Sequence, residues 1–130
     1  MASFASLDAL CDSILVISEN IQSVSAISKM GRLVGSTSRP KFAGRFNDCM
    51  DENLFMQCVL QISMGRDFDD YYGPINYHIS DRGSITMLTF PMGENVLLVS
   101  CNKNVSPITL AKKVANAIRA YHGQASAIEL

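Results

Sequence analysis

Hydrophobic residues between positions 51 and 72 recur with a helical period, but they form two faces instead of one. At about 100° per residue the two sets lie nearly opposite each other, with Gln57 and Gln61 as the only clean polar stripe. A surface helix of a small domain normally has one apolar and one charged face. This helix therefore needs cover on two sides, its own sheet on one and a second copy or a partner on the other. The first face holds Leu54, Phe55, Cys58, Val59 and Ile62, and the second holds Met56, Leu60 and Met64.

A helix and a hairpin are predicted before this segment. Ser6 can cap a first helix with apolar residues at i, i+3, i+4 and i+7, which ends at Glu19 and Asn20. A run rich in β-branched residues at 21–28 and a short return at 33–34 flank a tight turn, which predicts a β-hairpin. The segment 35–50 shows no periodicity, and we expect a loop there.

Three strands and a last helix are predicted after it. Gly73 and Pro74 end the middle helix, because neither residue continues a helix readily. Apolar runs at 75–80, 85–90 and 96–101, separated by short turns, predict an antiparallel meander. Ser106 and Pro107 then mark the start of a helix that we expect to end at Gly123.

Three acidic residues, Asp67, Asp69 and Asp70, follow closely on the middle helix. Carboxylates are unfavourable at a helix C-terminus, so we expect a break near Gly65 or compensation by Arg66. A calcium loop needs ligands at alternate positions and a distal glutamate, and this segment has neither.

The order of elements predicts an α+β fold with a five-stranded antiparallel sheet, αββαβββα. We expect the first and last helices on one face and the middle helix on the other. The chain reads as one domain over residues 1–123 with a C-terminal tail at 124–130. One helix cannot cover five strands, which is a second reason to expect a partner on that face.

Composition supports a small domain that assembles. The 130 residues are 48% hydrophobic and 18% charged, with a net charge of −1. Homo-oligomerisation is the commonest way to bury surplus apolar surface. A charge near zero provides no field for nucleic acid or an anionic membrane, so we expect neither as a partner. The start of the chain lacks a signal-peptide pattern and no apolar run could span a membrane, which predicts a cytoplasmic protein.

No set of residues supports catalysis. Cys11, Cys49, Cys58 and Cys101 are far apart, and we expect free thiols in a reducing compartment. The spacing allows a pair of Cys58 or Cys101 with His78, but apolar surroundings raise the pKa of a thiol and suppress its reactivity. Motifs for phosphate binding, dinucleotide binding and a nucleophile elbow are missing. We therefore predict no enzyme, no cofactor and no metal site.

A basic segment follows the predicted hairpin turn. Such a segment, with interleaved phenylalanines, can bind an acidic protein surface, a phosphate or nucleic acid. It can equally be a solvated loop that balances nearby acids, which is the interpretation we favour, with an anionic partner next and nucleic acid last. Its cations are Lys29, Arg32, Arg39, Lys41 and Arg45.

The element order resembles the roadblock/dynein light chain family. Three local features carry the resemblance: the turn K-x-G-R-L-V at 29–34, the long middle helix ending at Tyr72–Gly73, and the strand-to-helix passage at 100–104. It covers nearly the whole chain, in layout more than in residues, and the basic loop 35–45 has no counterpart in the family. The segment from Gly73 through the TFPMGENVLLVS run also looks like small uncharacterised archaeal proteins of this layout.

The resemblance implies a homodimer or heterodimer. In the family the middle helices pack together and the third strands, here 75–80, pair across a two-fold axis into one continuous sheet. The interface would then contain Met56, Leu60 and Met64 with Tyr77 and His78. Without the resemblance, Met56, Leu60 and Met64 can be interpreted in two ways: as an adaptable contact seam, or as ordinary core under the 35–50 loop.

The resemblance also implies a function without catalysis. Family members are scaffolds, commonly for small Ras-like GTPases, and some stimulate GTP hydrolysis by positioning the GTPase's own groups. The alternative is a small-molecule sensor of the profilin or PAS kind, with a pocket between middle helix and sheet. That pocket would be lined by Phe55, Met56 and Leu60 and covered by the 35–50 loop. A monomer with a ligand pocket would favour the sensor, and an obligate dimer the scaffold.

Overall fold

The computed structural model describes residues 6–42 and 48–129, of which 48–50 and 123–129 are described by their backbone course alone. Helices and strands follow one another in the predicted order, with the predicted middle helix divided into α2, η3 and α3. The helices are α1 (Leu7–Leu15), α2 (Asp48–Gly65), α3 (Asp69–Tyr72) and α4 (Pro107–Glu129), with 3₁₀ turns η2 (Pro40–Phe42) and η3 (Arg66–Phe68). The strands are β1 (Ile21–Ile27), β2 (Leu33–Ser38), β3 (His78–Asp81), β4 (Thr86–Met92) and β5 (Asn95–Cys101).

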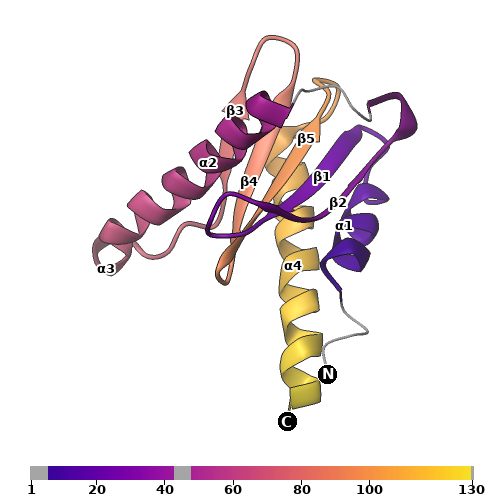
Figure 1. Ribbon diagram of the computed structural model, residues 1–130. Coiled ribbons are helices and arrows are strands. Elements are labelled where there is room, and N and C mark those ends of the chain that lie inside the picture. Colours follow the sequence, from indigo (N-terminus) through magenta and orange to yellow (C-terminus); the bar gives the residue numbers. More distant parts are fainter. Residues whose placement is uncertain (1–5, 43–47, 130) are drawn as a thin grey trace.

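The five strands form one antiparallel sheet in the order β2-β1-β5-β4-β3. Helices α1 and α4 pack on one face and α2 crosses the other (Figure 1). The predicted fold class and the distribution of helices between the two faces are confirmed. The order leaves β2 and β3 as the two edge strands, and β5 at the centre.

The main core lies on the α1/α4 face. Val24 and Ala26 of β1 point to this side, as do Leu88 and Phe90 of β4 and their neighbours in β5, and all are essentially fully buried. The expected cap at Ser6 is present, since its hydroxyl accepts a hydrogen bond from the amide of Ala9 at 3.1 Å. The helical residues that close this core are Leu10, Cys11, Ile14, Leu110, Ala111, Val114 and Ile118.

The core beneath α2 is much smaller. Cys58, Val59 and Ile62 face the sheet, where they meet residues such as Val96 and Leu98 of β5. Toward β2 the same sheet face is lined by serines instead of hydrophobic residues. The sheet is therefore covered unequally, with most of its apolar burial on the α1/α4 side.

The middle helix is interrupted between Gly65 and Asp69, close to the three acidic residues. Regular α-helix ends at Gly65, η3 follows, and α3 restarts at Asp69 with Asp69 and Asp70 in its first turn, where the helix dipole favours them. Ile75 packs closely on Gly65: a Cβ there would lie 2.2 Å from Cδ1 of Ile75, so the end of that side chain would have to shift. The expected break near Gly65 is confirmed.

Four predicted boundaries are wrong. The first helix, expected to end at Glu19 and Asn20, ends at Leu15, because the chain turns at 16–20 to enter β1. The expected loop at 35–50 contains the rest of β2 and η2 and, beyond 43–47, which lie outside the described residues, the start of α2. The strand expected at 75–80 begins only at His78, because the chain first passes beneath Gly65. Helix α4 continues past Gly123 to Glu129 (Figure 1), since one glycine costs a helix only about 1 kcal/mol.

Arg39 ties the end of β2 to the rest of the fold. Its Nε donates to the carbonyl oxygen of Ile21 at 2.8 Å, and one terminal nitrogen donates to those of Leu15 and Ser18, each at 2.9 Å. These carbonyls lie at and just after the C-terminus of α1 and at the start of β1, where a cation is favourable. This side chain of the expected basic loop is therefore engaged within the domain.

Replacing Arg39 should destabilise the domain. We expect Arg39→Met to lower the free energy of unfolding by about 2 to 3 kcal/mol, because three part-buried carbonyls lose a charged donor. Urea denaturation followed by circular dichroism measures the change. Arg32→Met, at an exposed cation of the β1–β2 turn, is the matched control and should change stability by less than about 0.5 kcal/mol. Equal losses in the two variants would contradict the bridging role of Arg39.

Candidate protein-interaction surface

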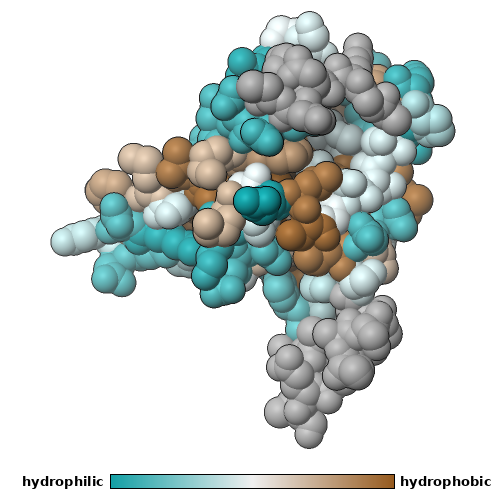
Figure 2. All heavy atoms as spheres, in the orientation of Figure 1, coloured by the Kyte–Doolittle hydropathy of each residue, from teal (hydrophilic) through white to brown (hydrophobic). Residues whose placement is uncertain are grey.

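Exposed hydrophobic side chains gather on the α2 side of the molecule. Among the described residues, all the large exposed hydrophobics except Val16 and Ile108 lie on the β1–β2 hairpin, α2, η3 or α3. Figure 2 shows hydrophobic surface along α2 and over the hairpin. Monomeric proteins rarely leave large hydrophobic patches exposed, so this surface is the candidate site for an interaction. The set comprises Met30, Leu33, Val34, Met56, Leu60, Met64, Phe68, Tyr71 and Tyr72.

Met56, Leu60 and Met64 form a ridge along the outer side of α2. They are spaced four residues apart and are 39%, 49% and 66% exposed, so exposure rises toward the end of the helix that projects beyond the sheet (Figure 1). Met56 is the most covered because it packs against the hairpin turn. A Cβ at Gly31, whose φ is +78°, would lie 2.8 Å from the terminal methyl of Met56. The structure therefore brings the three residues together on the side away from the sheet.

An aromatic cluster extends this ridge at the tip of the helix. Phe68 follows Met64 at the same spacing of four, and Tyr71 and Tyr72 are 78% and 86% exposed. The ring centroid of Tyr72 lies 6.4 Å from that of Phe68 and 6.5 Å from that of Tyr71. We missed these residues in the sequence because the acids around them suggested only a solvated turn. The repeat of four from Met56 to Phe68 is the signal that could have found them.

Tyr77 and His78 lie on opposite sides of the sheet. His78 pairs with Thr89 on the α2 side, and its Nε2 is buried without a hydrogen-bond partner. Tyr77 precedes β3 and faces Phe90 on the α4 side, with the ring centroids 6.0 Å apart. Of this pair, only His78 shares a face with the ridge of α2.

The two edges of the sheet differ in how they are protected. Along β2, the amide of Ser36 donates to the carboxylate of Asp8 at 3.1 Å, and α1 packs against the strand. Strand β3 pairs with β4 on one side only. An exposed edge presents unpaired amide and carbonyl groups to another chain. Of the two edges, β3 is the one open to strand pairing.

The basic segment does not converge on one site. Lys29 is 3.8 Å from the carboxylate of Glu94, Lys41 lies over the ring of Phe42 at 5.1 Å, and Arg39 is bonded to backbone carbonyls. Arg32 is exposed in the hairpin turn, and Arg45 lies outside the described residues. The structure therefore disperses these cations around the hairpin.

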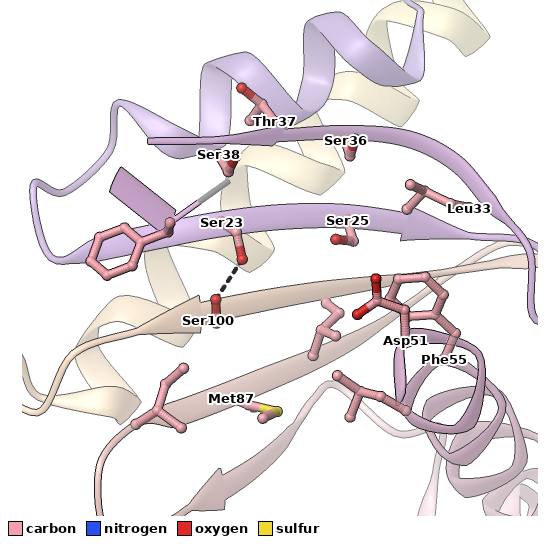
Figure 3. A pocket seen from close by; sticks show the side chains of 14 residues that line it. Ser23, Ser25, Leu33, Ser36, Thr37, Ser38, Asp51, Phe55, Met87 and Ser100 are labelled. Carbon is pink, nitrogen blue, oxygen red and sulfur yellow. Dashed lines mark hydrogen bonds between the residues drawn. The ribbon is translucent and has the colours of Figure 1, made fainter. Parts of the chain in front are cut away.

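A serine-lined cavity of about 210 Å³ separates the hairpin from the first half of α2 (Figure 3). Ser23 and Ser100 are joined across β1 and β5 by a hydrogen bond of 2.6 Å between their hydroxyls. Phe55 lines the cavity, whereas Met56 and Leu60, expected in a sensor pocket, do not. The volume is below the roughly 300 to 1,000 Å³ typical of small-molecule sites. This cavity therefore does not match the expected sensor pocket, whereas a second groove of about 410 Å³, between α2 and strands β3 and β4, is lined by Leu60 and falls within that range.

The described cysteines are buried free thiols with raised pKa values. Cys11, Cys58 and Cys101 are free and buried. Burial raises the pKa of all three, and for Cys11, with Asp8 and Asp12 nearby, to about 11. Within the described residues there is no group of histidine, cysteine and acidic side chains that could hold a metal ion. No described helix is long and apolar enough to cross a membrane.

These thiols should resist alkylation in the folded protein. We expect Cys11, Cys58 and Cys101 to react with iodoacetamide at pH 8 at least about tenfold more slowly than in urea, because the thiolate is the nucleophile and burial suppresses it. Peptide mass spectrometry after timed quenching measures each site separately. Rapid labelling of the folded protein at any of the three would contradict the burial described.

Solved structures of other proteins share this architecture. No family model and no curated protein matches the sequence. A roadblock/LC7 domain from Streptomyces avermitilis superimposes with a TM-score of 0.70 at 13% identity, covering 93% of this chain and 98% of that one. Myxococcus xanthus MglB gives 0.67 at 15% identity (90% and 87%), and Acanthamoeba castellanii profilin II gives 0.65 at 15% (92% and 99%). The chain therefore has the fold of roadblock/LC7 domains, which profilin shares.

Proposed function

We propose that the protein is a non-enzymatic dimerisation and scaffold module that presents a platform to a protein partner. The observation that carries this proposal is the gathering of exposed hydrophobic side chains on the α2 side. A two-fold dimer uses the same patch on both subunits, and a ridge of adaptable Met and Leu side chains suits such self-contact. The free edge of β3 beside it can extend the sheet across the same axis.

The arrangement of the ridge and the edge strand supports a single continuous interface. Leu60 belongs to the exposed ridge of α2 and also lines a groove beside the helix. Gln57, Gln61, Ser80 and Arg82 line the same groove. That groove separates α2 from β3 and β4, and it measures about 410 Å³. A second α2 laid along it would cover Leu60 and Met64 while the two β3 strands meet at their free edges.

The roadblock resemblance extends the proposal to a partner class, a small Ras-like GTPase, and to the cytoplasm as the compartment. The described thiols are free, as expected for a reducing compartment. Phe68, Tyr71 and Tyr72 belong to the same proposed platform, because aromatic residues dominate the binding energy of protein interfaces. The dimer is tested first, since the platform is built from it.

The absolute mass in solution tests the dimer. Light scattering over a concentration series should give a mass near twice 14.2 kDa for the wild type. Leu60→Asp should weaken dimerisation at least about tenfold, because a carboxylate would be buried in an apolar contact. Ile108→Asp is the matched control, because it introduces the same charge at a similarly exposed residue on α4. This variant should keep the mass of a dimer.

Two results would contradict the proposed dimer. One is a well-folded wild-type monomer across the whole concentration series. The other is an equal loss of mass in Leu60→Asp and Ile108→Asp, which would show that any new charge disrupts assembly. Circular dichroism of each variant verifies that the fold persists.

A further inference from the structure

A polar groove runs along α4 on the other side of the sheet from the α2 ridge. It consists of two cavities, of about 240 and about 340 Å³, between α4 and the segment that leads into β3. Both are lined by Asn76, Ala115 and Arg119, so they adjoin and form one elongated depression.

The groove carries positive charge without acidic neighbours. Lys112 lines one cavity, and Arg119 lines both. Among the described residues that line either cavity none is Asp or Glu, although the chain as a whole carries a net charge of −1. The amide oxygen of Asn116 accepts a hydrogen bond from the Arg119 guanidinium, which orients that cation. An anionic occupant would be attracted along the whole groove.

The shape of the groove suits an extended chain. Lys112 and His122 are ten positions apart on α4, which corresponds to about 15 Å. An extended peptide rises by about 3.3 Å per residue, so roughly five residues span that distance. Between the two ends the half-buried Ala115 lines both cavities, and the almost fully buried Ile118 and Phe90 lie beneath one of them. Asn76 and Asn116 supply amide groups that can bond to a peptide backbone.

We propose that this groove docks an extended acidic segment of a protein partner, with carboxylates that face Lys112 and Arg119 and an apolar side chain beside Ala115. The groove is open, and an isolated exposed ion pair contributes little, so an occupant needs several contacts in series. A linear segment provides them, whereas a small anion reaches one cation at a time. The proposal deepens the proposed function by locating a partner site on α4, separate from the α2 ridge.

Fluorescence anisotropy with the full chain tests the groove. The probe is a labelled pentapeptide of sequence Glu-Asp-Leu-Asp-Glu, and its neutral counterpart is Gln-Asn-Leu-Asn-Gln. The acidic peptide should bind, with an affinity that falls as salt rises, and the neutral peptide should bind at least about tenfold more weakly. Binding of both peptides with equal affinity, or of neither, would overturn the proposal.

Charge reversal on α4 provides the matched control. Lys112→Glu should weaken binding of the acidic peptide at least about tenfold, and further when combined with Arg119→Glu, whereas Lys113→Glu, at an exposed cation of the same helix that lines neither cavity, should change it less than about twofold. Ala115→Phe should also weaken binding, because it fills the groove without changing charge. Equal effects of Lys112→Glu and Lys113→Glu would show unspecific attraction to the helix and would overturn the groove.

Two further measurements distinguish the peptide groove from a site for a small anion and from the proposed dimer interface. Inorganic phosphate at the same ionic strength as a sodium chloride control should not compete specifically with the peptide, and specific competition would assign the cations to a small anion. Leu60→Asp should bind the acidic peptide with the wild-type affinity, even if its mass in solution changes. The α4 variants should have the wild-type mass. Failure of the groove and failure of the dimer are therefore distinguishable.

Discussion

Both faces of this five-stranded sheet carry hydrophobic residues that need cover, and the chain covers the two faces unequally. Helices α1 and α4 close one face over a large core, whereas α2 alone crosses the other. The rest of the structure depends on this imbalance. Because α2 cannot hide the whole face, the uncovered part is polar where water reaches it, and the outer side of α2 stays apolar where a second chain can bury it.

The chain protects the uncovered regions by different means. On the β2 side, serines line the sheet, Asp8 caps the amide of Ser36 and α1 packs against the strand, while Arg39 ties the end of β2 to the end of α1 and the start of β1. On the β3 side the strand pairs with β4 alone, and α2 projects beyond the sheet with Met64 exposed. The two edges of one sheet therefore differ in how much of the same chain packs against them.

The two faces of the molecule also differ in chemistry. The α2 side offers apolar and aromatic side chains, which associate by desolvation, whereas the α4 side offers cations beside amide groups. A module with both surfaces can dimerise through one and hold a charged partner on the other, because the sheet separates them.

The sequence by itself determined the elements whose signals are local. The cap at Ser6, the start at Pro107, the break at Gly65 and the two-faced period of the middle helix all depend on residues a few positions apart. Only the tertiary structure decided what depends on distant partners. The sequence predicted the hairpin of β1 with the start of β2, but β2 has no apolar alternation after Val34, so its continuation to Ser38 was not predicted. Arg39 acquired its role only because the fold brings it close to the end of α1 and the start of β1. The groove on α4 likewise exists because segment 75–77 crosses beside that helix, and no local pattern encodes such a contact.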